Sequence, residues 1–166
     1  RNSNFLGVYV MFEPNAFDGK DAEFVGKPGH DNTGRFIPYW RRDEQGKGVL
    51  EASVNYMVEG KGDYYLIPKK TKKEAVIDPY LYPVGGKEVL MTSLVVPILD
   101  KQKNFLGIVG IDLDLQDVQK LISGLRLTDY ATAYATFYSA NGTVISTRNV
   151  SYIGKKLKEI DYQESQ

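Results

Sequence analysis

Two carboxylates, Asp112 and Asp114, lie near the end of an otherwise apolar run, Phe105–Leu115 (FLGIVGIDLDL). Because side chains alternate along a strand, both acids point to the same face, as the paired carboxylates of a hydrolase would. A carboxylate that is buried in such a run needs a partner. Asp112 is therefore a candidate contact for a bound ligand. The alternative is that Asp112 and Asp114 cap a solvent-exposed turn into the next segment.

The remaining residue types give little support to catalysis. The chain contains no cysteine, which excludes disulfides, thiolate catalysis and cysteine-based metal sites. Its one histidine, His30, lies between Gly29 and Asp31 in loop-like surroundings and is interpreted as solvated. The sequence shows no nucleophile beside a base, no metal-ligating cluster and no phosphate-binding loop. We therefore expect a domain that is not an enzyme, with no catalytic residues, no metal and no cofactor.

The charge of the chain is balanced, with 21 Lys and Arg against 21 Asp and Glu. A neutral chain has no general attraction for nucleic acid or anionic lipid, so we expect no nucleic-acid partner. Lys69, Lys70, Lys72 and Lys73 form a local basic cluster. It is interpreted as a solvated helix end rather than an anion site, because lysines near a helix C-terminus interact favourably with the negative end of the helix dipole.

Length and hydropathy indicate one full domain and part of a second. The chain has 166 residues, 42% of them hydrophobic, which is enough to build a packed core. The most apolar stretch, Leu90–Leu99, is too short to span a bilayer. No leader pattern of a charged and then apolar segment opens the chain. We expect an excised soluble piece or a mature fragment.

The elements that must position these residues are mostly strands. Phe105–Leu115 has apolar side chains on both faces, which predicts a strand covered on both sides. Gly107 and Gly110 within it mark the close approach of another group, which can be a ligand. Asp63 is the expected N-cap of a short helix. The predicted strands are Phe5–Phe12, Arg35–Arg41, Tyr80–Val84, Glu88–Leu99 and Phe105–Leu115; the predicted helices are Asp63–Glu74 and Gln116–Leu125; and a hairpin is predicted over Tyr130–Ile145.

Five segments in order carry a resemblance to a known family. They read RFIPYWRRD, DYYLIPKK, DPYLYP, LMTSLVVPI and FLGIVGIDLDLQDVQ, between Arg35 and Gln119. This series resembles the membrane-distal half of a double-Cache sensor domain, the PAS-like, PDC-type extracytoplasmic part of chemoreceptors and sensor histidine kinases. The tail TAYATFYSANGTVISTRNVSYIGKKL resembles the start of the membrane-proximal half. The resemblance covers nearly the whole chain.

The resemblance implies an α+β fold with a central antiparallel sheet flanked by helices, plus part of a second Cache subdomain. It implies that residues 1–116 form the distal, ligand-binding subdomain and residues 117–166 the linker helix and the incomplete second one. The implied receptor is anchored in the membrane and homodimeric, with its sensor on the periplasmic or extracellular face. Because the family dimerises through a long helix absent here, we expect this fragment to be monomeric or weakly dimeric.

The resemblance also implies a ligand site. In the amino-acid-binding branch, a basic residue lies two positions before an aromatic pair, a Tyr-x-Asp begins sixteen residues after the pair's first member, and an Asp ends the last strand. Here Gly62 stands at the basic position and Tyr82 at the first Asp. A cation for an α-carboxylate is therefore missing, unless Lys61 supplies it. What remains is an aromatic box with one carboxylate, made of Trp40, Tyr64, Tyr65, Tyr80, Tyr82 and Asp112.

Such a box suits an amine or a quaternary ammonium through cation–π contact and one ion pair. A flat heterocycle stacked on an aromatic ring is a second candidate. The leading hypothesis is a chemoreceptor sensor that binds a small molecule, an amine or an amino-acid derivative. The alternative is the sensor of a histidine kinase that binds a small carboxylate or a purine. A hypothesis of another class is a structural or adhesion module in which all the aromatic residues are core.

Overall fold

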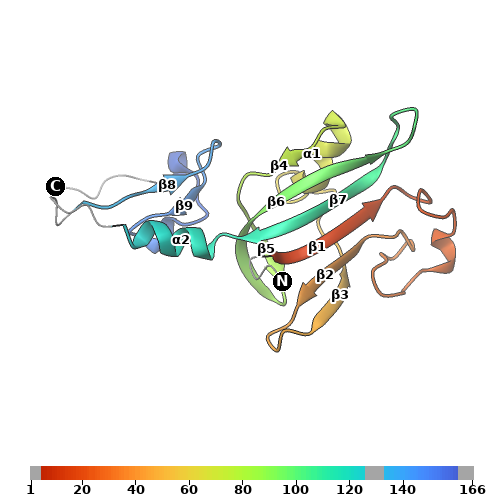
Figure 1. Ribbon diagram of the computed structural model, residues 1–166, viewed down its shortest axis with the longest axis horizontal. Coiled ribbons are helices and arrows are strands. Elements are labelled where there is room, and N and C mark those ends of the chain that lie inside the picture. The colour runs from red at the N-terminus through yellow and green to blue at the C-terminus, as the bar shows by residue number, and fades with distance from the viewer. Residues whose placement is uncertain (1–4, 126–132, 161–166) are drawn as a thin grey trace.

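A computed structural model of the chain describes residues 5–125 and 133–160. Within them, a seven-stranded antiparallel sheet has the order β3-β2-β1-β7-β6-β4, and β5 pairs with the other half of β6 (Figure 1). The predicted α+β fold with a central antiparallel sheet is confirmed. The strands are β1 Phe5–Phe12, β2 Pro38–Arg42, β3 Gly48–Ala52, β4 Ala75–Val76, β5 Tyr80–Val84, β6 Lys87–Leu99 and β7 Phe105–Asp114.

The centre of the sheet is formed by the first strand and the last two. β6 and β7 make a long hairpin, whose turn is held by the Asp100 carboxylate accepting the backbone N–H groups of Gln102 and Asn104. β1 pairs with β7 on one side and with β2 on the other. Between β1 and β2, a long connection contains only the short 3₁₀ helix η1, Asp21–Glu23. The predicted strand at Arg35–Arg41 starts three residues late, at Pro38.

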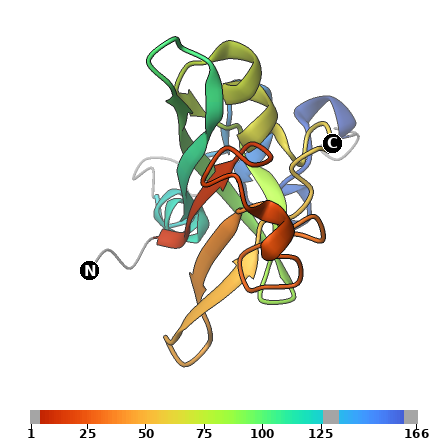
Figure 2. The same ribbon diagram turned by 90° about the vertical axis from the view of Figure 1, so that its right-hand side faces the viewer.

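One face of the sheet is covered by α1, Asp63–Thr71, which packs on β6, β7 and β4. The predicted N-cap of α1 was Asp63, but the structure places Gly62 at that position. Asp63 is instead the first helical residue, where its carboxylate accepts the N–H of Gly60. Tyr64 and Tyr65 are the buried aromatic side chains of this helix. In Figure 2, α1 and the loop with η1 lie on the same side of the sheet.

The two faces of the sheet differ in burial. On the face that α1 covers, called the inner face, side chains of the central strands are buried: Tyr9, Met11, Met91, Val95 and Ile108. On the opposite, outer face, apolar side chains of the same strands are exposed: Val8 at 45%, Val96 at 50% and Val109 at 43%. The prediction that the last strand is covered on both sides is therefore wrong within the described residues.

The C-terminal part forms a small unit beside the sheet. It consists of α2 (Gln116–Ser123), the hairpin of β8 (Phe137–Tyr138) and β9 (Val144–Ser146), and the 3₁₀ helices η2 (Val150–Tyr152) and η3 (Leu157–Glu159). The predicted hairpin is present but shorter, and its expected start at Tyr130 lies outside the described residues. Leu90, Leu115 and Ile145 form a buried cluster that joins this unit to the sheet. No helix in the described ranges is long and apolar enough to cross a membrane.

Candidate functional site

Asp112 is a carboxylate in the middle of the apolar inner face. β7 places it opposite Gly7 of β1 and Ser93 of β6. Its side chain is only 2% exposed. The Ser93 hydroxyl donates a 2.6 Å hydrogen bond to Asp112 Oδ1. Within residues 5–125 and 133–160, no cation forms an ion pair with Asp112, so the structure leaves its negative charge uncompensated.

Burial governs the protonation of this group. Removal from water disfavours the charged form and raises the pKa of Asp112 from its usual value near 3.8 to about 6. The hydroxyls of Ser93 and Tyr39 act in the opposite direction and lower this pKa. The Tyr39 hydroxyl lies close enough for this effect, although its geometry falls short of a full hydrogen bond.

Two glycines leave space for tyrosine rings beside Asp112. A Cβ at Gly7 would lie within 3.0 Å of ring atoms of Tyr39, and one at Gly110 would lie equally close to the ring of Tyr9. The rings therefore fill the space that side chains at these positions would need. The expected close approach at Gly110 is confirmed, and the group that approaches is a tyrosine ring of the protein itself.

Five tyrosines form a packed group on the inner face, here called the tyrosine cluster. The rings of Tyr64 and Tyr80 are stacked, with centroids 6.4 Å apart and an interplanar angle of 8°. Tyr82 meets both of them edge to face, at 6.1 and 6.0 Å. Its members are Tyr9, Tyr39, Tyr64, Tyr80 and Tyr82, contributed by β1, β2, α1 and β5.

The hydroxyls of the tyrosine cluster fall into two groups. Those of Tyr64 and Tyr82 bind the backbone of Val54, which ties the segment before α1 to the sheet. The hydroxyls of Tyr9 and Tyr39 are buried, and neither makes a hydrogen bond in the part of the chain that the structure describes. A buried hydroxyl without a partner is costly. These two groups therefore have unused capacity for hydrogen bonds beside Asp112.

Tyr80 belongs to a chain of hydroxyls that ends at Asp112. Its hydroxyl lies 2.8 Å from Ser93 Oγ, which in turn lies 2.6 Å from Asp112 Oδ1. Ser93 has a single hydroxyl proton, and an ionised Asp112 can only accept. In that state Tyr80 therefore donates to Ser93 and Ser93 donates to Asp112. Burial, with the nearby Asp112 charge second, raises the pKa of Tyr80, so it remains a neutral donor.

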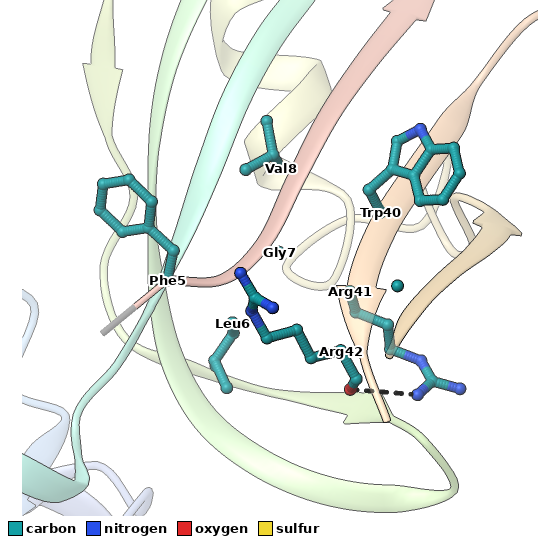
Figure 3. Close-up of a pocket in the computed structure, with 8 residues that line it drawn as sticks. Phe5, Leu6, Gly7, Val8, Trp40, Arg41 and Arg42 are labelled. Carbon is teal, nitrogen blue, oxygen red and sulfur yellow. Dashed lines mark hydrogen bonds between the residues drawn. The ribbon is translucent and has the colours of Figure 1, made fainter. Parts of the chain in front are cut away.

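The structure brings together four of the six predicted site residues, namely Tyr64, Tyr80, Tyr82 and Asp112. Trp40 is not among them: it lies on the outer face and is 52% exposed, because β2 alternates and Tyr39 takes the inner position. Its assignment to the aromatic box is corrected on this ground. A hollow of about 320 Å³ adjoins the indole on the outer face, and Figure 3 shows Trp40 and Val8 extending from neighbouring strands there.

Tyr65 is buried, but its hydroxyl belongs to a different network. It hydrogen bonds to Glu13, which also forms ion pairs with Lys69 at 2.9 Å and with Arg35 at 3.4 Å. The Arg35 guanidinium lies 5.0 Å from the Tyr65 ring centroid. Adjacent helix positions point about 100° apart, so Tyr65 cannot share the direction of Tyr64. Its assignment beside Asp112 is likewise corrected: it anchors α1 to the end of β1.

The position expected to hold a cation is closed by backbone. A Cβ at Gly62 would lie 2.5 Å from the carbonyl oxygen of Tyr56 and 2.6 Å from that of Asn55. No side chain can therefore stand there without movement of the main chain. Lys61, the alternative cation, is exposed in the turn before α1.

Asp114 has a separate role from Asp112. Its carboxylate accepts the backbone N–H of Gln116 at 2.8 Å, at the start of α2. The turn-capping interpretation thus holds for Asp114 alone. No group of three or more His, Cys, Asp or Glu side chains in the described ranges is arranged to hold a metal.

Sequence reasoning missed Tyr9, Tyr39 and Ser93. Tyr9 could have been found from the sequence. It shares the period-two alternation of Met11 on β1, which predicts that both point to the same face, and Gly110 lies opposite it on β7. Ser93 was hidden in the apolar run of β6, and only the register with β7 sets it opposite Asp112.

Comparison with known proteins agrees with this architecture. Residues 1–120 match the model of the family described as methyl-accepting chemotaxis protein-like, first PDC sensor domain. The chain is 32% identical, over 99% of its length, to the methyl-accepting chemotaxis protein TlpQ of Pseudomonas aeruginosa, of which it spans 25%.

Solved structures with the same fold include extracellular sensor domains. One, assigned to the histidine kinase mmHK1S-Z3, is 40% identical with a TM-score of 0.79; the match covers 93% of this chain and 54% of that one. The periplasmic sensory domain of the Campylobacter jejuni chemoreceptor Tlp1 shares the fold at 17% identity and a TM-score of 0.64, over 98% of this chain and 55% of that one.

Proposed function

From the premise that the chain belongs to the family of first PDC sensor domains of methyl-accepting chemotaxis protein-like receptors, we propose that it is a ligand-binding sensor for small cationic amines. The observation that carries the proposal is Asp112, a buried carboxylate that has no counter-ion among the described residues and is surrounded by the tyrosine cluster. A bound ammonium would supply the missing charge. The site residues that we propose are Asp112, Ser93 and the five tyrosines of the cluster.

Aromatic rings around one carboxylate favour a cation over a neutral or anionic ligand. Ring faces attract a cation, and the attraction strengthens when water is excluded. The unused hydroxyls of Tyr9 and Tyr39 are suited to accept N–H groups of an ammonium beside Asp112. Because Asp112 and four of the five tyrosines of the cluster are buried here, a ligand reaches Asp112 only when the covering segment around Val54 and α1 moves. Such movement is the kind of change that a ligand converts into a signal.

Recognition of an α-carboxylate has less support. At Gly62, two residues before Tyr64, backbone carbonyl groups leave no room for a cationic side chain. The cations Arg35 and Lys69 are both paired with Glu13. A carboxylate buried without a cation is strongly disfavoured. We therefore propose that the sensor prefers an amine to the amino acid with the same side chain.

The rest of the receptor enters the proposal through the family. Residues 1–116 would form the ligand-binding unit on the periplasmic or extracellular face, and residues 117–166 the connection to a second unit. The whole receptor would be a membrane-anchored homodimer, and this fragment monomeric or weakly dimeric. Relatives with a chemotaxis and with a kinase output both match, so the sensor suits either.

Matched ligand pairs test the proposal. Agmatine and arginine differ in the α-carboxylate, as do phenethylamine and phenylalanine. We expect at least one of the two amines to raise the melting temperature of the chain and to bind in calorimetry, and its amino acid to bind at least tenfold more weakly.

The control uses the two acids of β7. Asp112→Asn should abolish the shift, whereas Asp114→Asn, two residues along the same strand, should retain it. Tighter binding of the amino acids, or binding that survives Asp112→Asn, would contradict the proposal.

A further inference from the structure

The charge state of Asp112 in the empty site has a consequence for sensing. Asp112 accepts a hydrogen bond from Ser93 and takes part in no ion pair within the described residues. Resting on the proposed function, we infer that the empty site holds a proton on Asp112 in mildly acidic surroundings, and that a cationic ligand binds only as this proton leaves. The sensor would then report amine concentration and acidity together.

In the part of the chain that the structure describes, the groups packed around Asp112 supply hydroxyls and no positive charge. β1 and β2 contribute Tyr9 and Tyr39, and β5 contributes Tyr80 and Tyr82. Burial raises the pKa of all four phenols, so each stays neutral across the physiological range. Neutral donors stabilise a carboxylate less than a cation does, and burial raises the pKa of Asp112 to about 6.

The charged groups nearest to this site do not reverse the effect. Asp63 of α1 acts on Tyr80, and Glu51 of β3 acts on Tyr82; both are acids and add negative potential. Arg41 of β2 interacts with Tyr39, but its guanidinium is paired with Glu51. No neighbour among the described residues therefore holds Asp112 ionised in the empty site.

The coupling predicts a pH-dependent affinity with a defined sign. Only the ionised carboxylate pairs with an ammonium, so the apparent Kd rises as the ionised fraction of Asp112 falls. With a pKa of about 6, that fraction drops about tenfold between pH 7.5 and pH 5.0. Agmatine and phenethylamine stay cationic over this range, so the loss of affinity would arise in the protein.

The decisive experiment titrates Asp112 in the empty protein. Carbon-13 NMR of the protein labelled at aspartate Cγ follows the chemical shift of each aspartate carboxyl as the pH changes. The Asp112→Asn variant identifies the resonance of Asp112. We expect a midpoint near pH 6. Ser93→Ala removes a hydroxyl that lowers this pKa and should move the midpoint upward, whereas Thr92→Val, which removes the neighbouring hydroxyl bonded to Ile77, should leave it unchanged. A midpoint near pH 4 overturns the inference.

Calorimetry then separates the coupling from the proposed function. Agmatine and phenethylamine are titrated at pH 7.5 and pH 5.0, and at pH 6 in phosphate and in citrate buffer, which carry no amine and whose ionisation heats differ. We expect about tenfold weaker binding at the lower pH and a buffer-dependent heat that reports proton release. Binding that is equal at both pH values overturns the coupling alone. If neither amine binds at either pH, the proposed function is overturned and, with it, the coupling.

Discussion

The two faces of the sheet differ in the side chains that stand out on each: the largely apolar inner face buries a few polar groups, and the outer face exposes apolar ones. The inner face buries Asp112, Ser93 and four tyrosines of the tyrosine cluster, with Tyr80 partly buried, whereas the outer face exposes Val8, Val96 and Val109 of the same central strands. Burying unpaired polar groups costs stability, and exposed apolar side chains contribute little to it. The apolar side chains of the inner face favour its burial, and Asp112 and Ser93 are the polar exceptions within it. The difference fits our proposal that the polar groups of the inner face recognise a ligand.

The largest expected effect comes from removing the inner carboxylate. Asp112→Ala should lower the affinity for an amine by a factor of about 100 or more, because a buried ammonium would lose its counter-ion. Calorimetry measures the loss, and Asp114→Ala is the control on the same strand. An affinity unchanged within twofold in Asp112→Ala would remove the functional distinction between the two faces.

The same carboxylate should lower the free energy of unfolding of the ligand-free protein at neutral pH. Its folded pKa of about 6 lies above the usual 3.8, so the folded state binds the proton more tightly than the unfolded state does. The stability associated with this proton is present in acid and is lost as the pH rises from about 4 through 6. Asp112→Asn should therefore raise the free energy of unfolding at pH 7 by about 1–3 kcal/mol, and by less at pH 5. Denaturant titrations that show a lower value at pH 7 would contradict this expectation.

A methyl group on the inner face tests the seating of the rings. Gly7→Ala would push Cβ into the ring of Tyr39, so the ring must leave its place beside Asp112. We expect a loss of about 1–3 kcal/mol in unfolding free energy from overpacking, together with weaker amine binding. Val109→Ala on the exposed outer face should cost less than about 1 kcal/mol. Equal costs in the two variants would mean that the faces are packed alike.

The hydroxyl chain should contribute a smaller effect. Tyr80→Phe keeps the ring but removes the proton donated to Ser93, and we expect amine binding to weaken about fivefold, the value of one hydrogen bond. Tyr65→Phe removes a hydroxyl of the Glu13 network and should leave binding unchanged. The reverse order of these two effects, measured by calorimetry, would move the site toward Tyr65.

Trp40 should give the smallest effect. Because its indole lies on the outer face, Trp40→Ala should change amine affinity by less than about twofold and unfolding free energy by less than about 1 kcal/mol. A tenfold loss of affinity would show that the ligand site extends to the outer face.

The sequence predicted the strands better than it predicted which way their side chains point. Long apolar runs and turn residues located β1, β5, β6 and β7, because backbone pairing and burial act on whole segments. Trp40 was assigned to the site and Tyr39 was not, since a one-residue change of phase in a strand reverses the face. The order of motifs along the chain identified Asp112 as a site residue. Its partner Ser93 could not be predicted in this way, because the pairing depends on the register of β6 against β7, and no local sequence pattern encodes that register.

NMR titration of the uniformly ¹⁵N-labelled chain tests the central claim most directly, because the chain has one tryptophan and hence one indole N–H resonance on the outer face. Agmatine and phenethylamine are added separately at pH 7.5. We predict that amides of Ser93, Asp112 and Tyr80 shift and saturate with one binding constant while the Trp40 indole resonance stays in place. Saturable shifts at the Trp40 indole, with Ser93 and Asp112 unmoved, would contradict the assignment of recognition to the inner face.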